Sequence, residues 1–131
     1  MIYILLNLAP ILVATGIGLL FGAAYRATFD RAATPPVSIT TLLVATLGLF
    51  WFAPILAVAL ILAPPKAAPW IMAVGSAVVI WAGFVLPVVA IMQSYRGARF
   101  GQIARDAVFW LVTMVAQAVV MKLIGLVAPP A

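Results

Sequence analysis

The sequence predicts an all-α integral membrane protein, a four-helix bundle with one transmembrane domain over residues 1–131. Apolar residues make up 68% of the chain and charged residues 7%, whereas a soluble domain carries about 25% charged residues. Long apolar blocks recur roughly over residues 2–24, 39–63, 70–93 and 107–127. Each block has the ~20 residues that a helix needs to cross a hydrocarbon core of ~30 Å, so each is expected to span a membrane.

The residue inventory limits the chemistry that the chain can perform. It contains no Cys and no His, which excludes thiol and imidazole chemistry and most transition-metal sites. We therefore expect neither a metal nor a cofactor. The net charge of +5 could suit nucleic acid, but basic side chains at the ends of apolar spans more often meet anionic lipid headgroups. The expected partner is a lipid bilayer with anionic headgroups, and no nucleic acid.

The first block, MIYILLNLAPILVATGIGLLFG, is predicted to be a retained span. It lacks a basic segment, and its apolar run exceeds the ~7–15 residues of a signal-peptide core. Ala14, Gly18 and Gly22 recur at every fourth residue, the small-residue pattern that lets helix backbones approach closely in lipid. We predict a helix contact along this stripe, made either with another span of this chain or with a second copy.

The second and third blocks must be antiparallel neighbours, because the connection PPKAAP is short and its prolines end both helices. Gly75 and Gly83 on the third block lie nearly on one face and are predicted to oppose the small-residue stripe of the first. Trp51 and Trp81 lie about halfway along their blocks, and Phe84 follows on the third. These aromatic residues indicate either a midplane site for an apolar ligand or lipid, or ordinary aromatic packing.

The fourth block carries Gln117 at mid-span, where a polar side chain needs a hydrogen bond. Gln117 is therefore expected either to bond a neighbouring helix or to contact a ligand. Asp106 directly precedes AVFWLVTMV, so we expect it to cap the fourth helix or to lie in its first turn, near the positive end of the helix dipole. Pro10, Pro54 and Pro87 interrupt the first three blocks, and each removes one helix hydrogen bond.

Charged residues gather in and beside the first and third connections, which must share one side of the membrane. The expected charge cluster consists of Arg26, Asp30, Arg31, Arg96, Arg99, Arg105 and Asp106. The other side has Lys66, with Lys122 able to extend toward it. Since Lys and Arg of short loops collect on the cytoplasmic face, we predict a cytoplasmic cluster and two non-cytoplasmic termini. The cluster is expected to orient the protein and pair the two connections, not to catalyse a reaction.

Three stretches, NLAPILVATGIGLLFGAAY, WAGFVLP and RFGQIARDAVFWLVTMVAQAVVMKLIG, resemble the bacterial family catalogued as domain of unknown function seventeen-sixty-one. Trp81, Gly83 and Phe84 match its third-span signature, and Asp106 matches its acidic position before the last span. The chain departs from the family pattern around residues 25–37. The resemblance implies a small four-span bacterial membrane protein, and it implies no activity. Together with the distribution of basic residues, we predict the bacterial inner membrane as the location, with periplasmic termini.

The favoured function is that of a non-enzymatic packing or accessory subunit of a homo-oligomer or larger membrane complex. An apolar ligand or lipid near Trp51 and Trp81 is compatible with it. The alternative is a small-molecule transporter or channel, which is disfavoured because no carboxylate lies within a predicted span. An enzyme would have to rely on Asp30 or Asp106 for acid–base work, and we predict that the chain is not one.

Overall fold

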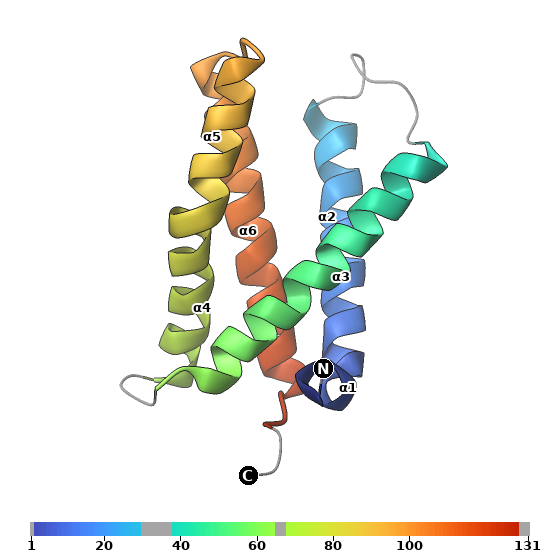
Figure 1. Ribbon diagram of the computed structural model, residues 1–131, viewed down its shortest axis with the longest axis vertical. Coiled ribbons are helices and arrows are strands. Elements are labelled where there is room, and N and C mark those ends of the chain that lie inside the picture. Colours follow the sequence, from blue (N-terminus) through green and yellow to red (C-terminus); the bar gives the residue numbers. More distant parts are fainter. Residues whose placement is uncertain (1, 30–37, 65–67, 129–131) are drawn as a thin grey trace.

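The structure is a computed structural model that describes residues 2–29, 38–64 and 68–128, in which all regular elements are helical (Figure 1). In chain order these are α1 (Ile2–Leu6), α2 (Leu8–Phe29), α3 (Ile39–Leu62), α4 (Pro69–Ile80), the π-helical turn η1 (Trp81–Val85), α5 (Leu86–Tyr95) and α6 (Phe100–Ile124). The four stretches long and apolar enough to span a membrane are Leu8–Phe29, Ile39–Leu62, Pro69–Tyr95 and Phe100–Ile124. The predicted all-helical fold with four membrane-type helices is confirmed, and it indicates a small membrane protein.

Helix α6 is the centre of the bundle. It contacts α2 on one side and the row α4–η1–α5 on the other, whereas α2 does not contact that row. Helix α3 crosses the others diagonally (Figure 1) and contacts α1, α2, α4 and α6. The core where these helices meet is rich in alanine, which lets the backbones approach closely. Its members are Ile11, Ala14, Ala53, Leu56, Ala57, Ala77, Met114, Ala118 and Met121.

Proline placement explains two irregularities. Pro10 has no N–H to give to the carbonyl of Leu6, and the helix is broken there into α1 and α2. Pro87 likewise cannot bond the carbonyl of Gly83, and the preceding turn widens into η1, where the N–H of Leu86 bonds the carbonyl of Trp81. Pro54 lies inside α3 without ending it.

Two predicted span boundaries are wrong. The first span is not one helix over residues 2–24, because α1 ends at Leu6 and α2 continues to Phe29. The fourth span begins at Phe100, well before residue 107, and Arg99 occupies its N-cap position. Asp106 therefore neither caps this helix nor lies in its first turn. It lies in the second turn, inside a membrane-type helix.

The ends of the helices place most of the predicted charge cluster at one end of the bundle. Helices α2 and α5 end there and α6 begins there (Figure 1), and the arginines carried to that end are Arg26, Arg96, Arg99 and Arg105. Lys122 lies in the last turn of α6, at the opposite end. Asp30, Arg31 and Lys66 lie outside the described residues. The side that faces the cytoplasm stays a prediction.

The first residues and the last described residues are joined at the opposite end. The side-chain amide of buried Asn7 donates to the carbonyl of Val127 at 2.9 Å, and the N–H of Val127 donates to the Asn7 Oδ1 at 2.6 Å. Two hydrogen bonds across 120 residues of sequence therefore fix both ends of the described chain to the same end of the bundle.

Candidate functional site

The carboxylate of Asp106 joins three helices. The hydroxyl of Tyr25 on α2 donates to Asp106 Oδ1, and the side-chain amide of Gln93 on α5 donates to Asp106 Oδ2 at 2.5 Å. Hydrogen bonds to an ionised acceptor are stronger than those between neutral groups. Asp106 thus links the ends of α2 and α5 to the second turn of α6.

Arg105, the residue before Asp106, packs against aromatic rings of α2. Its Nε donates to the hydroxyl of Tyr25 at 3.1 Å. Its guanidinium carbon lies 4.9 Å from the centroid of the Phe29 ring and 5.9 Å from that of Tyr25, within the ~6 Å range of a cation–π attraction. The Tyr25 ring in turn lies 4.5 Å from that of Phe109 on α6. These contacts hold a half-buried guanidinium in a fixed place between α2 and α6.

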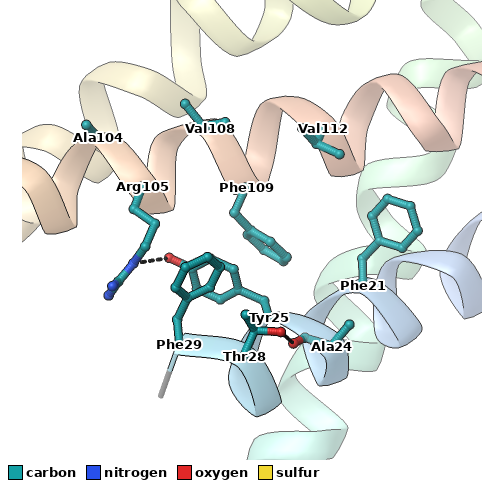
Figure 2. A pocket seen from close by; sticks show the side chains of 10 residues that line it. All are labelled: Phe21, Ala24, Tyr25, Thr28, Phe29, Ala104, Arg105, Val108, Phe109 and Val112. Carbon is teal, nitrogen blue, oxygen red and sulfur yellow. Dashed lines mark hydrogen bonds between the residues drawn. The ribbon is translucent and has the colours of Figure 1, made fainter. Parts of the chain in front are cut away.

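An apolar groove of about 630 Å³ runs between α2 and α6 beside this arginine. Figure 2 shows Arg105 and Phe29 at one end of the groove and Phe21 and Val112 at the other. The lining side chains are Phe21, Ala24, Tyr25, Thr28, Phe29, Ala104, Arg105, Val108, Phe109 and Val112. A groove with this lining can hold an apolar or amphipathic molecule.

The aromatic residues predicted to bind an apolar ligand do not come together. Trp51 is 66% exposed on α3 and lines a separate hollow beside Tyr3 and Ile4 of α1. Trp81 instead turns to α6, where its Nε1 donates to the carbonyl of Ala107 at 2.8 Å. Phe84 is 72% exposed, whereas Trp81 packs against the buried core, so Trp51, Trp81 and Phe84 are not gathered at one place.

Gln117 is buried on α6 and bonds a neighbouring helix. Its Nε2 donates to the carbonyl of Ala14 on α2 at 3.1 Å. Its Oε1 is buried with no hydrogen-bond partner among the described residues. The structure therefore places Gln117 in the α2–α6 contact and away from the groove lining, which makes interhelical bonding its observed role.

The small-residue stripe of the first span packs at only part of its length. Ala14 and Gly18 are buried, and a Cβ placed on Gly18 would lie 2.7 Å from Leu49 Cδ2 and 3.2 Å from Gln117 Nε2. A Cβ on Gly22 would meet no described atom within 4 Å. The surface that opposes the stripe is therefore formed by α3 and α6.

The opposing surface expected from the third span is absent among the described residues. Helix α2 contacts neither α4 nor η1, and a Cβ on Gly75 or Gly83 would meet nothing within 4 Å. The physical reason is that α6 lies between these helices. The two glycines instead leave open space on the outer surface of the bundle.

Sequence analysis missed the neutral partners of Asp106. These are Tyr25 and Gln93. Each is a hydrogen-bond donor within about one turn of the helix end on the arginine-bearing side, and this shared position is the signal that could identify them. No group of residues in the described part of the chain could hold a metal ion.

Comparison with protein-family models, with curated proteins and with solved structures finds no match to the chain. The family resemblance carried by the first, third and fourth spans therefore stays a prediction, and any function must be argued from the residues described above.

Proposed function

We propose that the chain is a non-enzymatic packing or accessory subunit of a homo-oligomer or of a larger membrane complex. The observation that carries the proposal is the exposure of the outer helix Pro69–Tyr95. Of its described residues, only Ala73 and Ala77 are buried by the rest of the described chain. Gly75 and Gly83 lie on this helix with open space in front of them. Small residues on a membrane-facing surface let another helix approach closely, so this helix is suited to an external partner.

The use of the polar side chains supports a non-enzymatic role. Asn7, Trp81 and Gln117 each bond a backbone carbonyl on another part of the chain. Thr15, Thr46 and Ser76 bond carbonyls one turn back in their own helices. The first three side chains join separate parts of the chain, and the other three are satisfied within their own helices. A nucleophile or base, in contrast, must face space that a substrate can enter.

The proposal includes an orientation. The arginine-bearing end faces the cytoplasm and both termini lie in the periplasm, with the bacterial inner membrane as the location. The support is that Arg26, Arg96, Arg99 and Arg105 share one end of the bundle, while Lys122 is carried near the other, and that basic residues near short loops collect on the cytoplasmic face.

The test is the mass of the particle extracted in a mild detergent. The wild type is expected to elute as an assembly, well above the 13.8 kDa of one chain, or with a stoichiometric membrane partner. Gly75→Leu and Gly83→Leu should dissociate it, because leucine would block the close approach. Gly16→Leu is the matched control, since a Cβ on Gly16 also meets nothing within 4 Å but lies on α2. A monomer without partner, or equal loss in the control, contradicts the proposal.

A transporter or channel remains the second candidate, and the position of Asp106 favours it. This carboxylate lies within the helix Phe100–Ile124, which is long and apolar enough to span a membrane, whereas it was expected at the start of the fourth helix. An ionisable group inside a membrane helix marks a candidate proton or ion path. In liposomes containing a pH-sensitive dye, the wild type should then carry protons under a K⁺ diffusion potential, and Asp106→Asn should not. Proton entry no faster than in protein-free liposomes contradicts this candidate.

A further inference from the structure

We propose that a second copy of this chain docks on the outer helix Pro69–Tyr95, and that the indole N–H of its Trp51 donates to the backbone carbonyl of Ala82. The inference rests on the proposed function, in which this outer helix is the surface for an external partner. It identifies that partner as another copy of the chain, and it identifies the hydrogen bond that joins the two copies.

The turn before Pro87 leaves one backbone carbonyl without its helical donor. In an α-helix the carbonyl of Ala82 accepts from the N–H four residues later, but this N–H, on Leu86, bonds the carbonyl of Trp81 instead. The next nitrogen along the chain belongs to Pro87 and carries no hydrogen. Ala82 and Gly83 are both exposed, and there is open space in front of Gly83. The carbonyl of Ala82 is therefore an acceptor on the outer surface of the bundle.

Trp51 carries a donor that also lacks a partner. Its side chain is 66% exposed on α3, and its indole N–H bonds no residue in the described part of the chain. A tryptophan N–H away from water usually finds an acceptor, because a polar group left without one in hydrocarbon costs free energy. The hydroxyls of Thr46 and Ser76 already bond carbonyls of their own helices. Among the described residues, Trp51 is thus the exposed donor near the middle of a span.

The donor and the acceptor lie at the same depth. Trp51 lies twelve residues after the start of Ile39–Leu62 and eleven before its end, and Ala82 lies thirteen residues from either end of Pro69–Tyr95. Two copies inserted in the same orientation therefore carry both groups near the middle of the bilayer. Since Trp51 makes no such bond within its own described chain, the pairing requires a second copy.

The first experiment measures association in liposomes, by resonance energy transfer between copies that carry donor or acceptor fluorophores. Trp51→Phe removes the N–H and keeps an aromatic ring, so it should weaken association about three- to twentyfold, the range of hydrogen bonds between membrane helices. The control is Trp70→Phe, at a 47% exposed position twelve residues before Ala82, which should leave association unchanged. An unaffected Trp51→Phe variant, or an equal loss in the control, would overturn the inference.

The acceptor is tested through Pro87. Pro87→Ala restores a backbone N–H that the carbonyls of the preceding turn can accept, so it should weaken association about as much as Trp51→Phe does. The double variant should weaken it no further than either single variant, because both changes remove the same bond. Additive losses, or no loss in Pro87→Ala, would show that Trp51 does not bind this carbonyl.

A disulfide test locates the contact, since the chain has no native Cys. The second and third spans run in opposite directions (Figure 1), so Ile55 and Val79 both lie about one turn from the proposed bond toward the same end of the bundle. Copies carrying only Ile55→Cys should form a disulfide with copies carrying only Val79→Cys. The exposed position Val88, nine residues or about 14 Å further along the outer helix, is the control. An equal yield with Val88→Cys would contradict the proposed contact.

The results separate this inference from the proposed function. Assembled copies with neither the Ile55–Val79 disulfide nor a loss in Trp51→Phe would overturn the inference and leave the outer helix to a different contact. Wild-type copies without energy transfer would also overturn it. Extraction in a mild detergent then decides the proposed function, which survives with a stoichiometric partner of another kind and fails with a monomer alone.

Discussion

Gly18→Ala and Gly22→Ala form a matched pair that measures how tightly α2 packs. Both glycines lie on one face of α2, four residues apart. A Cβ on Gly18 would lie 2.7 and 3.0 Å from the two methyl carbons of Leu49, and 3.2 Å from the Gln117 Nε2. A Cβ on Gly22 would meet no described atom within 4 Å. The two variants therefore add the same atom to a filled position and to an open one.

The difference in the free energy of unfolding between the two variants measures the cost of steric overlap alone. Replacing glycine by alanine inside a helix stabilises it by about 1 kcal/mol, and this contribution is common to both positions. Overpacking by one methyl group costs about 1–3 kcal/mol, and only Gly18→Ala incurs it. The lower end of this range applies because the added Cβ meets only the ends of the Leu49 and Gln117 side chains. Gly18→Ala should therefore unfold at a free energy about 1 kcal/mol below that of Gly22→Ala.

The assay is reversible unfolding in mixed micelles, with increasing sodium dodecyl sulfate and helicity as the signal. Leu49→Ala completes a double-mutant cycle, since removing the Leu49 methyl carbons should relieve the clash and make the double variant more stable than the sum of the single effects predicts. Equal stability of Gly18→Ala and Gly22→Ala, or strict additivity with Leu49→Ala, would refute the packing argument.

Two further predictions concern the ends of the helices. Asn7→Leu removes both hydrogen bonds to Val127. Amide hydrogen exchange in residues 126–128 should therefore accelerate, while exchange in the middle of α6 stays unchanged. Unaltered exchange in residues 126–128 would show that these two bonds do not hold the C-terminal end. The second prediction concerns orientation, because residues 68 and 98 lie in connections at opposite ends of the bundle. In intact cells, Ala68→Cys should react with a membrane-impermeant maleimide added outside, and Ala98→Cys should not. The reverse labelling pattern would show that the orientation is opposite to the predicted one.

Hydropathy alone was sufficient to predict the helices but not all their ends. Each apolar block overlaps one of the four membrane-type helices, because a bilayer core tolerates little else. The stretch RFGQIAR before residue 106 was interpreted as a loop because it is polar. It is helical because a membrane helix continues into the interface, where Arg and Gln are good helix formers. Because the helix begins at Phe100, Asp106 lies in its second turn and not at the expected cap position.

Single residues of the candidate site could be predicted from the sequence, but the contacts between them could not. Arg105, Asp106 and Gln117 were selected from the sequence because charge and polarity are scarce there. Their partners depend on the order of the helices around α6, which a sequence of apolar blocks does not determine. The widened turn before Pro87 also rotates the residues that follow it away from the faces that an ideal helix would give them. Whether Trp51 and Trp81 lie together depends on the same order of helices.

The diagonal course of α3 has a consequence for how the protein meets membranes of different thickness. At about 1.5 Å per residue, its 24 residues measure about 36 Å, which exceeds a hydrocarbon core of about 30 Å, and the tilt accommodates the excess. All buried residues of α3 lie from Leu49 onward, so the helix is anchored to the described bundle mainly through its C-terminal part. A helix that is longer than the hydrocarbon core can meet a thinner or thicker bilayer by changing its tilt.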